Sequence, residues 1–446
     1  MNEIIENRFN SCLYPEQIRA QITVRPEPLI ALSDIDSRMA AELLAQALKQ
    51  IFVPNEFTIA FIQEMAGRAA LHSRLLFSSE VNYASRIYDP PESEVVPVCL
   101  TGLAGVGKSQ TIAALRKVLP APCDLTCNHY HGSVSLVSHW YASARGKASG
   151  KGLLSDFITG GRVPSQINVA QLLIECRRRA NRDGVSLVVL EETQHINTGL
   201  GAAKVTDILL SMAAIGPPMI FVSNYSLVHK LLRRNSEDKQ RLLSDPRIML
   251  PDEPGSADWI AYIDECIRVS NGSIRVGRDE LATEIYRCTF GIKRFAVQLL
   301  KQAYIECRNA GRQDIALPDI TRAYRSAAYT ISANEVEQLQ TLALSNWKST
   351  THLDLQCPFE LPAAVKSNVV QFARTERQSR VSAKVFDSAL TEGERAAKKQ
   401  LQASIKEEVE LVKPSRRPPV AKVTEEEQAK AFFDYIDGGK VSPKPD

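Results

Sequence analysis

One short stretch, residues 101–111, limits the possible folds of this 446-residue chain more than any other. Its sequence, T-G-L-A-G-V-G-K-S-Q-T, matches the phosphate-loop pattern G-x-x-x-x-G-K-[S/T] at Gly102, Gly107, Lys108 and Ser109. Glycines let several backbone N–H groups point at one anion, and a following helix adds the positive end of its dipole. The stretch therefore predicts a strand, a loop and a helix that together bind a nucleoside triphosphate.

Within this loop the pattern assigns two side chains to the chemistry. Lys108 is expected to reach the β- and γ-phosphates, and the Ser109 hydroxyl is expected to bind Mg²⁺. The predicted cofactors are therefore ATP and Mg²⁺. The residues expected to surround the nucleotide are Gly102, Leu103, Ala104, Gly105, Val106, Gly107, Lys108, Ser109 and Gln110.

The composition limits the class of protein. The net charge is only +3, so a nucleic-acid surface has to be a local patch. Nine cysteines without paired spacing favour a reducing compartment, and we expect a cytoplasmic protein. The first residues do not resemble a signal peptide, and no apolar run approaches the ~18 residues that a membrane span needs. We therefore expect no membrane partner.

Apolar runs alternate with helical patterns from residue 95 onward, which predicts an α/β fold with a parallel sheet flanked by helices. Strands are expected at residues 95–100, 123–127, 185–190, 218–223 and 247–250. The strand at 123–127 is expected to be followed by a helix that runs through Trp140. Residues 91–255 are the predicted nucleotide-binding domain.

The flanking regions differ in character. Residues 1–90 are predicted as an irregular arm, with a short strand at 20–24, followed by helices at 37–52 and 55–76. Helical patterns at 257–269, 279–308 and 318–328 predict a small helical lid within residues 256–350. Residues 351–446 are predicted as a charged, largely disordered tail. Its A-F-F-D-Y-I-D segment, residues 431–437, is predicted to dock a partner.

Two acidic residues, Glu191 and Glu192, end the apolar strand at 185–190. In an ATPase site the first acid completes Mg²⁺ coordination and the second orients or deprotonates the attacking water. An aspartate is usual at the first position, so Glu191 predicts looser metal geometry and slow turnover. Asn224 follows the strand at 218–223, where an amide can hold the water or sense the γ-phosphate.

Several arginines are candidates for contacts to the phosphates. Arg294 opens a lid helix and is expected to contact the nucleotide. Arg233 and Arg234 are favoured over Arg241 and Arg247 as the finger that would reach the nucleotide of a neighbouring subunit. For any single arginine the alternative is an ordinary surface residue, and such a finger requires an oligomer.

Residues 145–162 combine glycines with basic side chains, which indicates a flexible cationic loop suited to contacts with DNA phosphates. The alternative is a solvated insertion. The candidate DNA-binding residues are Arg145, Lys147, Lys151 and Arg162.

The chain resembles the TnsC/TniB family of AAA+ regulators of DNA transposition. The resemblance covers about residues 95–330 and lies in T-G-L-A-G-V-G-K-S (101–109), L-V-V-L-E-E-T-Q-H-I (187–196) and I-G-P-P-M-I-F-V-S-N (215–224), with Leu125, Cys127, Gly132 and Ser133. It implies an AAA+ P-loop fold with a lid, an N-terminal helical extension and a charged tail. The family normally has aspartate where this chain has Glu191.

The resemblance also implies partners. They are duplex DNA, further copies of the chain in a ring or helical filament, a target selector of the TniQ/TnsD type, and transposase subunits of TnsB or TnsA type. The transposase is expected to contact the N-terminal region or the tail, and Lys147 and Lys151 are expected to face DNA. The alternatives are an AAA+ helicase loader or replication initiator, a STAND-like signalling scaffold, and a small-molecule kinase.

Overall fold

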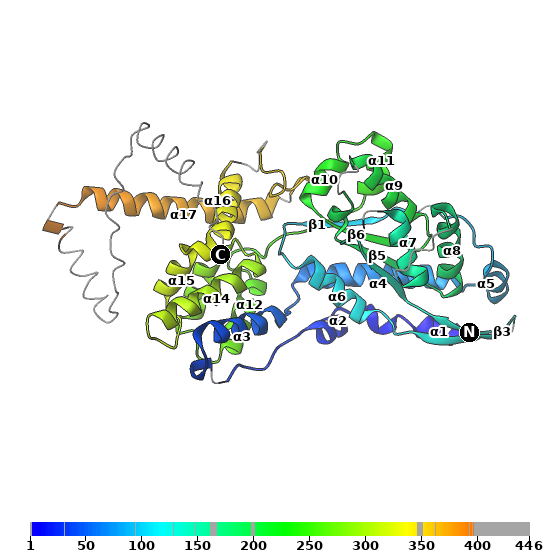
Figure 1. The fold of residues 1–446 in the computed structure, drawn as a ribbon, viewed down its shortest axis with the longest axis horizontal. Helices are drawn as coiled ribbons and strands as arrows, with labels where there is room; N and C mark the ends of the chain where they lie inside the picture. The colour runs from blue at the N-terminus through cyan, green and yellow to red at the C-terminus, as the bar shows by residue number, and fades with distance from the viewer. Residues whose placement is uncertain are drawn as a thin grey trace, which may run out of the picture. The chain divides into compact units, whose positions relative to one another are not determined.

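The structure, a computed structural model, describes residues 2–396 except 31, 94, 128, 148, 161–166, 198–200, 346–350, 362, 392 and 395. The chain divides into two compact units, Met1–Ala389 and Leu390–Asp446. Almost all of the second unit, including the 431–437 segment, lies outside the described residues. The fold below is that of the first unit (Figure 1).

A five-stranded parallel sheet forms the centre of the nucleotide-binding region. Its strand order is β4-β5-β6-β1-β7, and every neighbouring pair is parallel. The apolar runs predicted at 95–100, 185–190, 218–223 and 247–250 are confirmed as strands of this sheet. The strands are β1 (Val98–Gly102), β4 (His139–Ser143), β5 (Leu187–Glu191), β6 (Met219–Asn224) and β7 (Pro246–Met249).

Helices cover both faces of the sheet, which explains why its central strands are apolar on both sides. Leu187 and Val189 face one core, which includes residues of α4 (Glu56–Leu76) and α6, whereas Val188 and Leu190 face a second core with α7 to α11. The helices of this region are α6 (Lys108–Val118), α7 (Gly150–Thr159), α8 (Val169–Arg182), α9 (Gly201–Ala213), α10 (Tyr225–Leu231) and α11 (Ser236–Leu243).

The helix predicted through Trp140 is wrong. The chain instead forms an antiparallel hairpin of β2 (Cys123–Cys127) and β3 (Tyr130–Leu136), and then β4, an edge strand of the main sheet. Val134 and Leu136 are buried and alternate with exposed serines, a period of two that suits a strand. Serine and glycine are also poor helix formers.

The N-terminal region is mostly helical, and the two helices predicted there are confirmed. Its helices are α1 (Asn2–Asn7), α2 (Pro15–Ile22), α3 (Ser37–Gln50), α4 (Glu56–Leu76) and α5 (Glu80–Arg86). The irregular arm with a strand at 20–24 is wrong, because Ile18 and Ile22 lie one turn apart and are both buried on α2. Val24 makes only an isolated bridge with Phe52.

A second group of helices follows the sheet, where the lid was predicted. It comprises α12 (Ala257–Ser270), α13 (Arg278–Thr289), α14 (Lys293–Asn309), α15 (Leu317–Tyr324) and α16 (Thr330–Leu344). The single helix predicted at 279–308 is broken at Phe290 and Gly291, whose φ angles are 54° and 73°. A Cβ at Gly291 would lie 2.7 Å from the Asp252 carbonyl oxygen, so the break needs glycine.

The segment after α16 returns to the sheet and then continues as α17 (Ala363–Ala389). The His229 ring on α10 lies 2.9 Å from the Gln356 carbonyl oxygen. Phe372 on α17 packs edge-on against Tyr286 in α13. Composition alone favours disorder after residue 350, but Gln356 and Phe372 contact α10 and α13, so this part of the predicted tail packs on the rest of the unit. Among the described residues, no helix is long and apolar enough to cross a bilayer.

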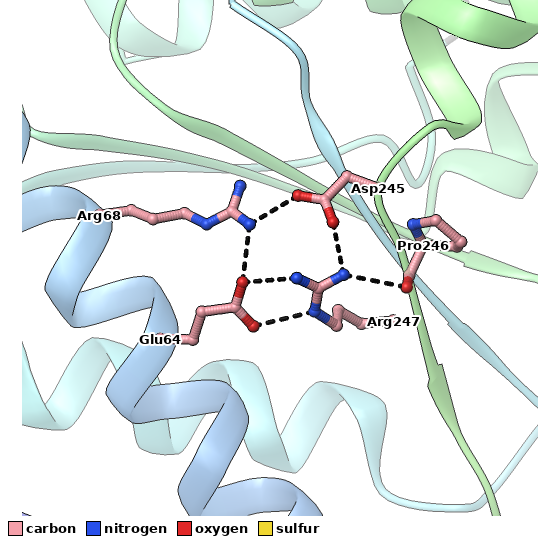
Figure 2. Close-up of polar contacts among 5 residues, drawn as sticks. All are labelled: Glu64, Arg68, Asp245, Pro246 and Arg247. Atoms are coloured by element: carbon pink, nitrogen blue, oxygen red, sulfur yellow. Dashed lines mark hydrogen bonds and ion pairs between the residues drawn. The ribbon is translucent and has the colours of Figure 1, made fainter.

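Four charged side chains tie the N-terminal helices to the edge of the sheet (Figure 2). Arg247 on β7 donates to both carboxylate oxygens of Glu64 on α4, at 2.6 and 2.9 Å. Arg68 lies 2.7 Å from Glu64 and 2.6 Å from Asp245, and Asp245 also pairs with Arg247. The hydrogen bonds from Arg247 lower the pKa of Glu64. Burial raises the pKa of Asp245, but the hydrogen bonds from Arg68 and Arg247 outweigh this effect, so that its pKa is also lowered.

Glu64→Gln is expected to lower the free energy of unfolding by about 1–3 kcal/mol at pH 7, because it breaks a bidentate, half-buried pair. Since the folded pKa of Glu64 is depressed, its contribution is full above the usual carboxylate pKa and is lost as the pH falls through the lower folded value. The difference in the free energy of unfolding between Glu64→Gln and the unaltered protein should therefore become smaller as the pH falls. Denaturant titrations at several pH values measure this, with exposed Glu16→Gln as the control. An equal effect of both variants would contradict the assignment.

Candidate nucleotide site

The phosphate loop lies between β1 and α6, as the sequence pattern predicts. Gly105 and Gly107 have φ angles of 85° and 114°, in the region that favours glycine. A Cβ on Gly102 would lie 2.3 Å from the Met249 carbonyl oxygen on the neighbouring strand. The glycines are thus required by the path of the backbone, and α6 starts at Lys108 with its free N–H groups at the loop.

Lys108 is buried at the start of α6 and points back over the loop. Its Nζ donates hydrogen bonds to the carbonyl oxygens of Gly102 and Leu103, at 2.8 and 2.7 Å. Burial, together with the nearby charge of Arg294, lowers the pKa of Lys108 to about 7. The ammonium group is therefore poorly compensated, and an anion in the loop would stabilise its charged form.

A cavity of about 750 Å³ opens above the loop. This volume falls in the range of small-molecule sites. It gathers predicted residues from five separate parts of the chain. Those that line it are Ala104, Gly105, Gly107, Lys108, Ser109, Gln110, Arg145, Glu192, Asn224 and Arg294.

Other predicted residues do not line the cavity. Leu103 and Val106 are buried and Gly102 is the last residue of β1, so these three shape the loop from below. The remaining residues outside the cavity lining are Glu191, Lys147, Lys151, Arg233 and Arg234.

The cavity also has walls that the sequence motifs did not predict. One wall comes from the end of α3, where Gln110 donates a 3.3 Å hydrogen bond to the Lys49 carbonyl oxygen. Another comes from α12 and α14. The unpredicted lining residues are Ala45, Leu48, Lys49, Ile51, Gln194, His195, Val222, Tyr262, Lys293, Val297, Gln298 and Lys301. Gln194, His195 and Val222 lie within the segments 187–196 and 215–224 that carry the family resemblance, although no role was predicted for them. The other residues belong to no short motif, and the packing of α3 on α12 and α14 brings these helices together.

Glu191 and Glu192 point in different directions. Glu192 has a φ of 52°, which is rare outside glycine, and this turns its side chain into the cavity. Its carboxylate lies 3.4 Å from His195 Nε2 and 4.0 Å from Arg145 Nε, too far for strong hydrogen bonds. A carboxylate without strong hydrogen bonds, lining the same cavity as Lys108 and Ser109, can accept a proton from a water molecule.

Glu191 is 7% exposed and accepts a 2.7 Å hydrogen bond from the Tyr141 hydroxyl group on β4. Burial and this bond to Glu191 raise the pKa of Tyr141 to about 12, so its hydroxyl is a donor at neutral pH. The other carboxylate oxygen, Oε1, is buried and has no hydrogen-bond partner among the described residues. A buried carboxylate oxygen without a partner is costly, and it is the kind of oxygen ligand that a divalent cation takes. It lies on the face of β5 that packs toward α6, the helix that carries Ser109 near its start.

The two cations at the start of α14 have different surroundings. Lys293 is paired with the buried carboxylate of Asp252 at 3.0 Å. Arg294 lies beside the phosphate loop, where its backbone N–H is 3.5 Å from the Gly105 carbonyl oxygen. Arg294 therefore lies at the loop, whereas Lys293, which also lines the cavity, is paired with Asp252 in the segment before α12.

The arginine candidates for a finger differ in what they contact. Arg247 is held in the cluster with Glu64, and Arg241 is paired with Glu237 at 3.1 Å. Arg234 donates a 3.0 Å hydrogen bond to Asp238 one turn along α11. Arg233 is exposed between α10 and α11. Arg247, Arg241 and Arg234 therefore contact carboxylates of this chain, whereas Arg233 is exposed at the surface.

Part of the basic segment that was predicted as a loop is the helix α7. Only residues 145–149 precede α7, which starts at Gly150 and is capped by Ser149. Lys147 is paired with Asp156 on this helix, whereas the Arg145 side chain is 78% exposed. Lys151 is half-buried in the first turn of α7, and Arg162 lies outside the described residues.

Together, the strand order β4-β5-β6-β1-β7, the phosphate loop after β1 and the helical group over the cavity define the class: an α/β P-loop NTPase fold of the AAA+ type. No model of a protein family and no curated protein matches the chain.

Several solved structures are similar to this chain at low sequence identity. The Aeropyrum pernix ORC2 protein, in its ADPNP–ADP complexes, is 11% identical over 71% of this chain and 94% of that chain, with a TM-score of 0.39. Cdc6p from Pyrobaculum aerophilum is 14% identical over 71% of this chain and 84% of that chain, with a TM-score of 0.37. The Thermotoga maritima RuvB Holliday junction branch migration motor is 12% identical over 69% of this chain and 87% of that chain, with a TM-score of 0.32.

Proposed function

We propose that this chain binds ATP with Mg²⁺ in the cavity above the phosphate loop and hydrolyses it slowly. The observation that supports this most is the convergence of Lys108, Ser109, Glu192, Asn224 and Arg294 on one cavity of about 750 Å³. The Lys108 amine also supports it, because burial lowers its pKa to about 7 and a bound anion would stabilise its charged form.

Each side chain then has a defined task. Lys108 exchanges its two carbonyl partners for phosphate oxygens, and Arg294 adds a second cation from the lid side. Glu192 accepts the proton of the attacking water, while the Asn224 amide orients that water. Ser109 and Glu191 would hold Mg²⁺, which neutralises phosphate charge when bound.

We further propose that nucleotide between neighbouring copies drives assembly of the protein on duplex DNA. Arg233 or Arg234 of one copy would contact the phosphates bound by the next. A ligand that binds only the assembled state stabilises it by its differential affinity, and hydrolysis then allows subunits to leave. The resemblance to TnsC/TniB regulators supports a role in DNA transposition, between a target selector of the TniQ/TnsD type and the transposase.

The DNA contact is proposed at Arg145 and Lys151. Lys147 is closely paired with Asp156, whereas Arg145 is 78% exposed and its nearest carboxylate, that of Glu192, is 4.0 Å away. In this proposal, the double variant Arg145→Ala, Lys151→Ala binds duplex more weakly, and the slope of log affinity against log salt falls by about two. Fluorescence anisotropy of a labelled duplex with a non-hydrolysable ATP analogue measures this.

Exposed Lys117→Ala on α6 is the matched control and should keep the slope. An unchanged slope in the double variant would remove these residues from the DNA interface. If duplex DNA also failed to stimulate ATP hydrolysis by the unaltered protein, a signalling scaffold or a small-molecule kinase would become the better proposal.

A further inference from the structure

Tyr141 connects three elements around the first acid of the site. It lies on the edge strand β4 directly beside Val189 of β5, so it shares the face of the sheet on which Glu191 follows two residues later. From there its hydroxyl group donates the 2.7 Å hydrogen bond to Glu191 Oε2.

The aromatic ring of Tyr141 is itself held in place. The Arg116 guanidinium lies over it, 3.9 Å from the ring centroid, which is close for a cation–π contact. Arg116 belongs to α6, the helix whose first residues are Lys108 and Ser109. The phosphate-loop helix, the edge strand and the acidic strand end are therefore joined through Arg116, Tyr141 and Glu191.

A glutamate at this position needs such support more than an aspartate would. It has one more rotatable bond, whereas Mg²⁺ requires near-ideal octahedral geometry. The bond from Tyr141 occupies Oε2 and leaves Oε1 buried without a partner among the described residues. The arrangement presents one free, desolvated oxygen in a fixed direction.

We propose that Tyr141 is a positioning residue that fixes the Glu191 side chain, so that its remaining oxygen serves the Mg²⁺ bound with the nucleotide. This inference rests on the proposed nucleotide function. In this proposal Glu191 and Tyr141 together direct a carboxylate oxygen at Mg²⁺, which a shorter aspartate would do alone. Loss of the hydroxyl group should therefore weaken metal binding and leave the contacts of the nucleotide with the loop intact.

The test is Tyr141→Phe, which keeps the ring under Arg116 and removes only the hydrogen bond. Binding of a non-hydrolysable ATP analogue is measured by calorimetry, first in EDTA and then across a Mg²⁺ titration. The expected result is analogue affinity in EDTA within twofold of the unaltered protein, and a Mg²⁺ concentration for half-saturation raised about tenfold, the size of one charged hydrogen bond. Electron paramagnetic resonance of Mn²⁺ provides a second readout of the metal.

Tyr83→Phe is the matched control, because it also removes a tyrosine hydrogen bond, the 2.6 Å bond to the Arg182 carbonyl oxygen at the end of α8. Tyr83 does not line the cavity. It should leave the metal requirement unchanged. Glu191→Gln should raise the metal requirement, and adding Tyr141→Phe to it should change nothing further, since both act through one carboxylate.

An unchanged or lowered Mg²⁺ requirement in Tyr141→Phe would overturn the inference and leave nucleotide binding standing. So would an effect that adds fully to that of Glu191→Gln. If the unaltered protein bound no analogue with or without Mg²⁺, the proposed function and this inference would both fail.

Discussion

Lys108→Ala is expected to lower the affinity for ATP by at least ~100-fold, because it removes two charge-assisted hydrogen bonds to phosphate oxygens, each worth about 1.5–3 kcal/mol. The exposed neighbour Lys117 lies on the same helix, so Lys117→Ala should bind ATP normally. Calorimetry or a fluorescent nucleotide measures both. Equal affinity of Lys108→Ala and the unaltered protein would contradict the assignment of the phosphate site.

The same lysine predicts a pH dependence. Burial lowers the pKa of Lys108 to about 7, so at pH 8 the amine of the free protein is mostly neutral. Phosphate favours the charged form, and binding should therefore take up close to one proton at pH 8. Affinity should fall as the pH rises above 7. Calorimetry in buffers of different ionisation enthalpy measures the uptake, which Lys108→Ala should abolish.

Glu192→Gln is expected to reduce ATP hydrolysis by about 10²–10⁴-fold, the usual contribution of a general base, and to leave ATP binding within a fewfold of normal. The amide keeps the size of the side chain but cannot accept the proton of water. Phosphate release and nucleotide binding, measured side by side, separate the two effects. Hydrolysis at the normal rate would assign the base to another residue.

The central sheet and the phosphate loop could be predicted because local sequence determines them. Residues 187–190 are all apolar, and all four are buried in the sheet. The glycines at 102 and 107 mark the loop in the sequence, because a side chain at either position would meet Met249. The strand at 123–127 is confirmed as β2, but its hairpin partner β3 lies where the sequence analysis predicts a helix. The period of two seen at Ser133–Leu136 was the available signal.

The rest of the site depends on contacts between distant segments. No local pattern places Lys49 of α3 beside Gln110, or joins Tyr141 to Glu191 across two strands. The left-handed backbone at Glu192 is equally invisible in the sequence, although it separates the directions of two adjacent acids. Motifs therefore predict the candidate reacting groups, whereas the side chains that contact them come together only through tertiary packing.

The most direct test of the proposed function is the mass of the protein with a duplex of about 50 base pairs, compared with and without a non-hydrolysable ATP analogue. Sedimentation velocity should show a DNA-bound assembly of several subunits only when the analogue is present, and Lys108→Ala should remain unassembled. A single subunit that does not bind DNA in the presence of the analogue would contradict nucleotide-driven assembly on duplex DNA.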